Sequence, residues 1–251
     1  MNGDRSTRSV AVIVVAAGRG ERLAGAAPKA LETIEGRSLL AHALSEIADV
    51  PDISQIVVAA PATHMAQTQA VCRQFVGLVP TVVAGGKERQ DSVRLAIDAL
   101  APGIDIVIVH DAARAFAPAK VFVRVIDAVA SGHAAVVPGM SVIDTIKDVD
   151  ADGRVRRTVP RASLRAVQTP QGFSRAVLAE AHENAIVGRT GASDCADSAS
   201  FPKPTDDAGM LEAAGYDVWM VAGDPDAFKI TTPFDRLIAQ ALVTRREETN
   251  D

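Results

Sequence analysis

The chain has 251 residues, and three of its loops carry residues suited to binding a phosphorylated ligand. The first loop, residues 16–29, contains closely spaced glycines and the cations Arg22 and Lys29. Glycines let backbone N–H groups turn towards a closely bound anion, and the two cations can neutralise its charge. The loop matches neither the dinucleotide fingerprint, which needs glycine at Leu23, nor the P-loop, which needs lysine at Ala26. A tight turn with solvated basic residues stays the alternative explanation.

The second loop spans residues 85–92, between an apolar segment and a helical one. Its paired glycines, Gly85 and Gly86, suit close contact between the backbone and a ligand. Asp91 and Ser92 can cap the helix that follows, and the Ser92 hydroxyl can instead bond a base or a sugar. Capping and ligand binding explain this loop equally well, so both interpretations stay open.

The third loop begins with His110-Asp111-Ala112-Ala113-Arg114, after a segment rich in Ile and Val. An aspartate there is costly to bury without a partner, so we expect Asp111 to face a wet cleft and a cation or a metal. Neighbouring residues of a strand point to opposite faces, so His110 and Asp111 do not form a catalytic dyad. We expect His110 to lie in the core or behind the site.

Strand-like and helix-like segments alternate through the first half of the chain and position these loops. The strand-like segments are apolar on both faces, and the helix-like segments repeat apolar residues every three or four positions. The expected strands are 10–16, 55–60, 80–84, 104–110 and 134–138, and the expected helices are 39–48, 65–75, 92–100 and 119–130. This alternation predicts a doubly wound, mostly parallel, Rossmann-like α/β sheet that binds ligands beyond the carboxyl ends of its strands.

The alternation breaks after Pro138. Two polar-rich segments, 141–149 and 154–159, flank an Asp-Ala-Asp-Gly turn and predict a β-hairpin arm over about 141–160. A two-stranded hairpin is marginally stable alone, so we expect it to pack on its own domain or on a second subunit. The remaining expected elements are strands 164–168 and 217–221, helices 174–186, 206–214 and 233–245, and a mobile loop at 188–204.

Composition limits the class of protein. With 48% hydrophobic residues, the chain can bury a large core, and we expect one domain over 1–251 with a flexible tail at 1–8. A net charge of −5 argues against a general nucleic-acid or membrane-surface binder. The two cysteines, Cys72 and Cys195, provide neither a disulfide framework nor a zinc site, so we expect a cytoplasmic protein.

The order of motifs from about Val10 to the final helix resembles the family of 2-C-methyl-D-erythritol 4-phosphate cytidylyltransferases, of the non-mevalonate isoprenoid pathway. The shared motifs are Ala-Ala-Gly-x-Gly-x-Arg-Leu, Pro-Lys, Gly-Gly-x-x-Arg-x-x-Ser, Val-His-Asp-Ala-Ala-Arg, Asp-Thr-Ile-Lys, Gln-Thr-Pro-Gln, Thr-Asp-Asp and Phe-Lys-Ile-Thr. His-Asp-Ala-Ala-Arg together with Gln-Thr-Pro-Gln separates this family from other sugar-nucleotide transferases. Two departures are Val15, where the family usually has proline, and a longer link before Thr205.

The resemblance implies a nucleotidyltransferase that moves CMP from CTP to methylerythritol 4-phosphate and releases pyrophosphate. The attacking phosphate oxygen is already ionised at neutral pH, so the reaction needs no general base. Cations and a divalent metal, Mg²⁺, are the expected means of stabilising charge at the α-phosphorus. The resemblance also implies a homodimer in which the hairpin arm contributes to the partner's site.

Residue roles follow from the same resemblance. The catalytic cations are Arg22, Lys29 and Lys229. The nucleotide is bound by Ala17, Gly18, Gly20, Gly86, Ser92, Asp111 and Ala112, and the metal by Asp111 and Asp226. The acceptor is met by Arg114 and Thr145 from one subunit and by Arg161 and Thr205 from the other.

Two other functions are compatible with these residues. A related nucleotidyltransferase with another sugar- or polyol-phosphate acceptor would keep Arg22, Lys29 and Asp111. A non-catalytic nucleotide-binding protein would bind CTP without turnover, although Lys29 and Lys229 argue against it. The incomplete glycine fingerprint disfavours a dehydrogenase.

Overall fold

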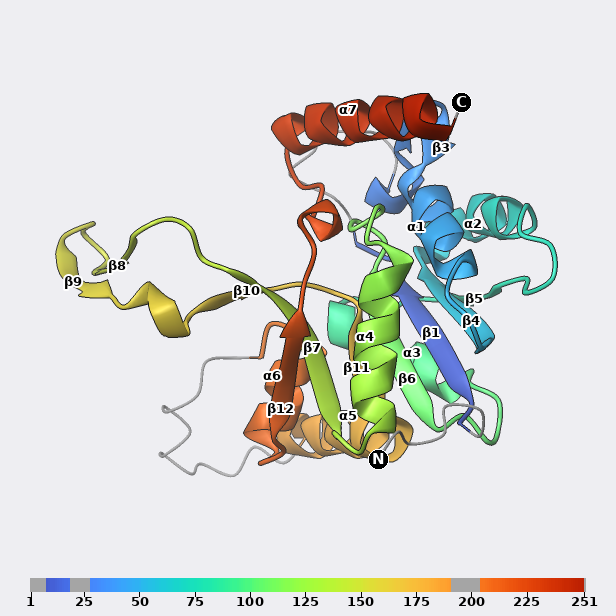
Figure 1. Ribbon diagram of the computed structural model, residues 1–251. Coiled ribbons are helices and arrows are strands. Elements are labelled where there is room, and N and C mark those ends of the chain that lie inside the picture. The colour runs from blue at the N-terminus through green and yellow to red at the C-terminus, as the bar shows by residue number, and fades with distance from the viewer. Residues whose placement is uncertain (1–7, 19–27, 191–203, 251) are drawn as a thin grey trace.

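The computed structural model describes residues 8–18, 28–190 and 204–250. The tail and most of the loop expected at 188–204 therefore lie outside the described residues, as do two of the expected site residues, Gly20 and Arg22. The described residues form a large mixed sheet with helices on both faces and a hairpin that projects from it (Figure 1). The predicted doubly wound α/β fold is confirmed.

The central sheet has eight strands in the order β10-β7-β11-β6-β1-β4-β5, and β12 pairs with β7. Strands β1, β4, β5 and β6 are parallel, as is the β7–β12 pair, whereas β10 and β11 run antiparallel to their neighbours. Their bounds are β1 Val10–Val15, β4 Ile53–Ala60, β5 Thr81–Ala84, β6 Ile106–Asp111, β7 Ala135–Ser141, β10 Arg165–Val167, β11 Gln171–Ser174 and β12 Val218–Ala222.

Helices cover both faces because the central strands are apolar on both sides. On β1, Val10, Val12 and Val14 join the core beneath one set of helices, and Ala11 and Ile13 join the core beneath the other. The first set is α1 Leu39–Ala48, α2 Met65–Cys72 and α4 Ala119–Ala130, and the second is α3 Arg89–Asp98, α5 Arg175–Thr190 and α6 Asp207–Ala213. Helix α7, Pro233–Asn250, packs on the small hairpin of β2 Thr33–Ile34 and β3 Arg37–Ser38.

Strand β11 was not predicted, although it lies at the centre of the sheet between β6 and β7. Its sequence, Gln-Gly-Phe-Ser, is short and has no apolar run. Gly172 fits there because α4 packs very closely: a Cβ on Gly172 would fall 2.4 Å from Val125 Cγ1. Helix boundaries also differ, since α5 continues to Thr190 instead of ending near 186.

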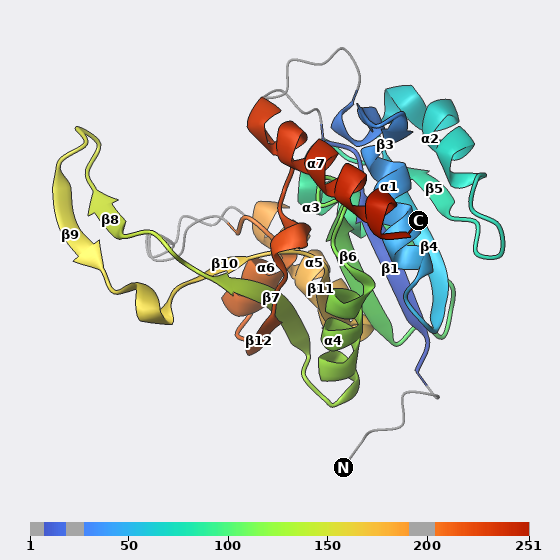
Figure 2. The ribbon, with the colours of Figure 1, turned by 45° about the horizontal axis from the view of Figure 1, so that its top comes forward.

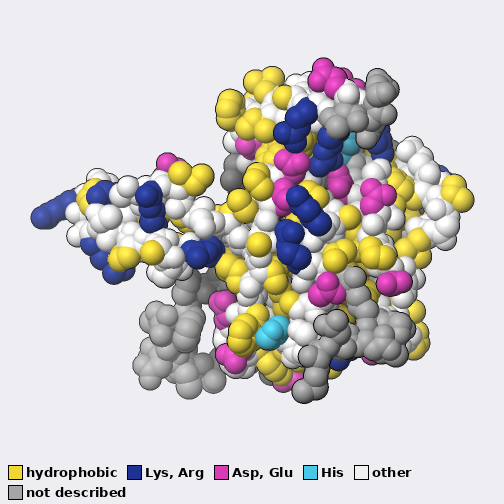
Figure 3. Space-filling model, viewed as in Figure 1, with side chains coloured by type: hydrophobic (Ala, Val, Ile, Leu, Met, Phe, Trp, Pro, Cys, Tyr) yellow, Lys and Arg dark blue, Asp and Glu magenta, His cyan; other side chains and the backbone are white. Residues whose placement is uncertain are grey.

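The predicted hairpin is present as β8 Ile146–Val149 and β9 Val155–Val159. We refer to residues 142–164 as the arm; the sheet and its covering helices are the body of the protein. Two views show the arm projecting from the body (Figures 1 and 2). Ile143 is 84% exposed, and Val149 and Val155 are about half exposed. Lys and Arg side chains gather along the arm (Figure 3).

No helix in the part of the chain that the structure describes is both long and apolar enough to span a membrane.

Candidate active site

The described parts of the three predicted loops meet at the carboxyl ends of β1, β5 and β6. Val15 and Asp111 are register partners at the ends of β1 and β6, and the Ala112 N–H donates to the Val15 carbonyl at 3.1 Å. Gly85 lies so close to the first loop that a Cβ on it would fall 2.4 Å from Ala17 Cβ. The described loop residues Ala17, Gly18, Gly86 and Ala112 are thus brought to one edge of the sheet.

The second loop is held by its own hydrogen bonds. The Gly86 N–H donates to Ser92 Oγ at 3.1 Å, and the Ser92 hydroxyl donates to the Glu88 carbonyl at 3.1 Å. Helix α3 begins at Arg89, with Glu88 as N-cap and Asp91 completing a capping box. The Ser92 side chain is buried, so its role in this structure is to orient the loop backbone.

Asp111 lies at the centre of the site, between two cations. Arg89 Nε is 3.1 Å from Asp111 Oδ1, and Lys229 Nζ is 2.7 Å from Oδ2. Burial by itself would raise the pKa of Asp111, but the charges and hydrogen bonds of Arg89 and Lys229 outweigh it and hold this pKa far below its usual range. Asp111 is therefore a buried, permanently ionised carboxylate at neutral pH, as the sequence predicted in expecting a cation beside it.

A second buried carboxylate, Asp207, shares the same arginine. Arg89 Nη1 lies 2.5 Å from Asp207 Oδ2, and His182 Nε2 lies 3.1 Å from Asp207 Oδ1. Asp207 is wholly buried in the first turn of α6. The network of Asp111, Arg89, Asp207 and His182 therefore joins β6, α3, α6 and α5 below the site.

Arg114 binds neighbouring backbone rather than an acidic side chain. Its Nη1 donates to the Ala227 carbonyl at 2.7 Å and its Nη2 to the Val167 carbonyl at 3.2 Å, while its buried Nε has no partner among the described residues. Ala227 is two residues before Lys229. Arg114 thus braces the loop that presents Lys229.

Lys29 and Thr205 lie on the body. Lys29 begins a 3-10 turn, Lys29–Leu31, that packs against α1. Thr205 is exposed and precedes Asp206, whose side chain caps α6 by accepting from the Gly209 N–H at 2.9 Å. The first loop's Arg22 and Gly20 lie outside the described residues, so their placement stays a prediction.

The arm groups two acceptor residues differently from the sequence-based expectation. Thr145 is exposed on the arm, and Arg161, also exposed there, donates to the carbonyl of Ile143, two residues before Thr145. The sequence-based expectation assigned Thr145 to the subunit of Arg114 and Arg161 to the other subunit, and this assignment stays a prediction. Thr145 and Arg161 both lie on the arm, which projects from the body (Figure 2), whereas Arg114 and Thr205 belong to the body.

The two proposed metal ligands are in separate ion pairs. Asp226 Oδ2 lies 3.3 Å from Arg246 Nη2 and 3.6 Å from Arg245 Nη2, whereas Asp111 is held by Arg89 and Lys229. Residues 8–18, 28–190 and 204–250 contain no group of three or more His, Cys, Asp or Glu side chains that could enclose a metal. This donor set fits Mg²⁺ that is bound mainly by nucleotide phosphates, with one or two carboxylates from the protein.

Sequence reasoning missed the roles of Gln168, Thr169 and Gln171, although their motif was noticed. Gln168 exchanges two hydrogen bonds with the backbone of Asp224, at 2.9 and 3.0 Å. Thr169 Oγ1 accepts from the Asp111 N–H at 3.0 Å, and Gln171 Nε2 donates to Asp206 at 2.7 Å. One short segment therefore holds the three loops that carry Lys229, Asp111 and Thr205.

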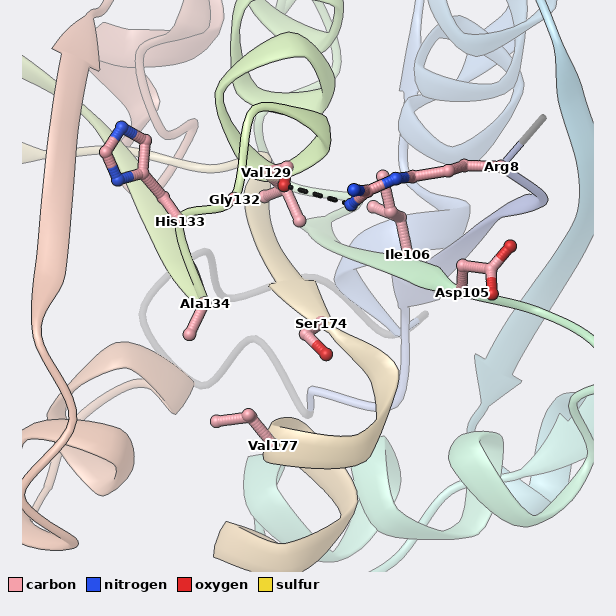
Figure 4. Close-up of a pocket in the computed structure, with 9 residues that line it drawn as sticks. All are labelled: Arg8, Asp105, Ile106, Val129, Gly132, His133, Ala134, Ser174 and Val177. Carbon is pink, nitrogen blue, oxygen red and sulfur yellow. Dashed lines mark hydrogen bonds between the residues drawn. The ribbon is translucent and has the colours of Figure 1, made fainter. Parts of the chain in front are cut away.

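A pocket of about 460 Å³ lies at the other end of the sheet, near the beginning of β6 (Figure 4). Arg8 points towards the Val129 carbonyl and donates to it at 3.4 Å, and Asp105 accepts from the Ser9 N–H. Asp105 and Asp111 lie at opposite ends of β6. This pocket is consequently separate from the candidate active site.

The fold and the site together define an α/β protein of nucleotidyltransferase type. The family model described as 2-C-methyl-D-erythritol 4-phosphate cytidylyltransferase matches residues 10–245. The chain therefore belongs to the 2-C-methyl-D-erythritol 4-phosphate cytidylyltransferase family.

Individual relatives agree with this assignment. The chain is 46% identical over 244 residues to the 2-C-methyl-D-erythritol 4-phosphate cytidylyltransferase of Frankia casuarinae, covering 96% of this chain and 84% of the relative. It is 43% identical over 237 residues to the bifunctional enzyme IspD/IspF of Clavibacter michiganensis, covering 93% of this chain but only 54% of that protein. Among solved structures, 4-diphosphocytidyl-2C-methyl-D-erythritol synthase from Anaerococcus prevotii superposes with a TM-score of 0.80 at 26% identity, over 95% of this chain and 97% of the other.

Proposed function

We propose that this protein transfers CMP from CTP to 2-C-methyl-D-erythritol 4-phosphate, giving 4-diphosphocytidyl-2-C-methyl-D-erythritol and pyrophosphate. The observation that carries the proposal is the ion pair between Lys229 and Asp111, where the nucleotide loops meet. In this pair, the buried Asp111 carboxylate holds a partly exposed Lys229 ammonium in place. A fixed cation of this kind can stabilise the negative charge of two reacting phosphates. Membership of the cytidylyltransferase family supports the identities of donor and acceptor.

The proposed chemistry is a single in-line displacement. An oxygen of the acceptor phosphate forms a bond to the α-phosphorus of CTP, the bond from that phosphorus to the bridging oxygen breaks, and pyrophosphate leaves with the electron pair. The attacking oxygen is already ionised at neutral pH, so the chain needs to supply no base. Its residues have to bring the two phosphates together and stabilise the charge that develops between them.

The proposed roles of the described residues draw on their placement in the structure, and those of Arg22 and Gly20 rest on membership of the family. Lys229, with Arg22 and Lys29, stabilises charge on the reacting phosphates, and Asp111 fixes the Lys229 ammonium at 2.7 Å. Gly86 offers its backbone to the cytosine, while the Ser92 hydroxyl shapes that loop by accepting from the Gly86 N–H. Ala17, Gly18, Gly20 and Ala112 line the rest of the nucleotide site.

Asp111 is the proposed protein ligand of Mg²⁺, since it is ionised and lies where the triphosphate is expected. Asp226, which Arg245 and Arg246 hold in this structure, is the proposed second ligand. A bound Mg²⁺ would neutralise part of the triphosphate charge.

A cytoplasmic homodimer completes the proposal. The arm exposes Ile143, Val149 and Val155, and a hairpin of two strands is marginally stable unless something packs against it. In a two-fold dimer, the arm of each copy would reach the body of the other and bring Thr145 and Arg161 to the partner's acceptor site. Arg114 and Thr205 would meet the acceptor from the body.

The test is pyrophosphate release from CTP and Mg²⁺, measured without acceptor and with methylerythritol 4-phosphate, glucose 1-phosphate or ribitol 5-phosphate. We expect release only with methylerythritol 4-phosphate, and none after EDTA is added. Release with another acceptor alone would replace the proposed substrate. CTP binding by calorimetry without release under any condition would indicate a non-catalytic nucleotide-binding protein.

A further inference from the structure

Arg89, the first residue of α3, is held between two buried carboxylates that belong to different parts of the site. Its Nε lies 3.1 Å from Asp111, at the end of β6, and its Nη1 lies 2.5 Å from Asp207, in α6. We propose that Arg89 is a positioning residue that fixes segment 204–207, and with it Thr205, to the Asp111 end of the nucleotide site. This inference rests on the proposed function, because the acceptor role of Thr205 is part of it.

The first step concerns Asp207, whose side chain is wholly buried. An ionised carboxylate in the interior needs charged or hydrogen-bonding partners, and here Arg89 and His182 supply them. Burial would raise the pKa of Asp207, but these partners hold it below its ordinary value. The start of α6 is therefore tied to α3 by a strong ion pair whose carboxylate is wholly buried.

The second step concerns segment 204–207 itself. Gln90, the next residue of α3, donates from Nε2 to the Pro204 carbonyl at 3.1 Å. Arg89 and Gln90 thus hold both ends of the segment, and Thr205 stands exposed between them. The same helix carries Ser92, which orients the Gly86 backbone. One turn of α3 therefore sets the distance between the cytosine loop and the acceptor segment.

The third step concerns Lys229. Arg89 and Lys229 share the negative charge of Asp111, one on each carboxylate oxygen. Without Arg89, Lys229 would be the one remaining ion-pair partner of Asp111 among the described residues, and its ammonium would be held there more tightly. Arg89 thereby leaves Lys229 available to phosphate, without touching the substrate itself.

The planar guanidinium explains why this position needs arginine. Two of its N–H groups face two different carboxylates at once, whereas the single ammonium of lysine is a point charge with no such fork. Arg89→Lys keeps the charge and is expected to lose the bridge. If Arg89 only neutralised buried Asp207, removing the Asp207 charge together with Arg89 would restore wild-type behaviour.

The experiment uses Arg89→Gln, Asp207→Asn and the double variant, with steady-state kinetics for CTP and methylerythritol 4-phosphate and with melting temperatures. The double variant removes one charge of each sign, so we expect its melting temperature to recover relative to Arg89→Gln. We expect its KM for the acceptor to stay raised about tenfold or more, with KM for CTP changed less than about threefold. A double variant with a wild-type acceptor KM would overturn the proposal.

Gln90→Ala gives a test that disturbs no buried charge. We expect faster hydrogen exchange in residues 204–214 and a raised acceptor KM, whereas Arg94→Gln, an exposed ion-pair partner on the same helix, changes neither. Unchanged exchange and KM in Gln90→Ala would contradict the coupling of α3 to this segment. Hydrogen exchange can be measured without catalytic turnover. If the wild-type protein transferred no CMP, the proposed function would be refuted, but the exchange rates of residues 204–214 would still test the coupling of α3 to this segment.

Discussion

The ammonium of Lys229 lies 2.7 Å from a carboxylate oxygen of Asp111, although 118 residues separate them in the chain. This contact joins the loop that follows β12 to the last residue of β6. Asp111 is buried, whereas 43% of the Lys229 side chain is exposed. The carboxylate is therefore fixed by the protein, and the lysine faces the space where phosphate is expected.

This arrangement predicts that Lys229→Ala lowers kcat far more than it weakens CTP binding. Charge near the α-phosphorus increases in the transition state, so a cation there stabilises the transition state more than bound CTP. We expect kcat to fall by about 100-fold or more and the Kd for CTP to change by less than about threefold. Single-turnover kinetics and calorimetry measure the two quantities, and equal losses in both would contradict this role. Lys147→Ala, on the arm, serves as a matched control.

A pair of glycine variants should separate ligand binding from folding. At Gly18 a Cβ would meet no atom of the described residues within 4 Å, whereas at Gly172 it would fall 2.4 Å from Val125 Cγ1. We expect Gly18→Ala to keep the unfolding free energy but weaken CTP binding about tenfold, because bound phosphates approach that backbone. Gly172→Ala should lose about 1–3 kcal/mol of stability, as overpacked cores do, and bind CTP normally. Denaturant titrations and calorimetry test both, and wild-type CTP affinity in Gly18→Ala would remove Gly18 from the site.

Much of the fold was predictable because its inner strands are largely buried. Strands β1, β4 and β6 are continuous Val- and Ile-rich runs, and their predicted bounds differ from the observed ones by two residues or fewer at each end. Strand β11 was missed because four residues with Gly172 among them show no such pattern. Its place between β6 and β7 depends on the close approach of α4, a tertiary contact that no local pattern encodes.

The site was predictable to the level of its loops, not of its supporting contacts. The carboxyl ends of parallel strands share one edge, so Asp111 and the glycine loops had to converge. Arg89 and Gln168 were overlooked because their partners, Asp207 and Asp224, lie far along the chain and meet them only through the order of the sheet. Both residues belong to motifs that the sequence analysis identified, but a motif does not show which distant residue each side chain contacts.

His110 predicts a specific pH dependence of stability. Burial lowers the pKa of His110 from 6.5 to about 4, and the ring packs on Phe122 with its Nδ1 beside Thr169 Oγ1. Between pH 6.5 and about 4 the unfolded chain binds a proton that the folded chain does not, so stability falls as the pH is lowered through this window. The metal-free protein should follow this slope in urea titrations, and His110→Gln should reduce it, leaving the share of His42, whose pKa burial also lowers. An unchanged slope in His110→Gln would contradict the assignment, and His64→Gln, at a half-buried histidine, is the control.

The arm predicts complementation between two inactive variants. Lys229→Ala disables the body of one subunit, and Arg161→Ala disables the arm. If each arm serves the partner's site, a mixed dimer has one site with both residues intact, since the Arg161 of the first variant reaches the Lys229 of the second. Random mixing makes half of all dimers mixed, so we expect about a quarter of wild-type activity. Activity is measured after the two purified variants are unfolded and refolded together, with sedimentation confirming dimers. If the arm instead serves its own subunit, no dimer has an intact site and the mixture stays as inactive as its parts, whereas Arg154→Ala at the hairpin turn should be active alone.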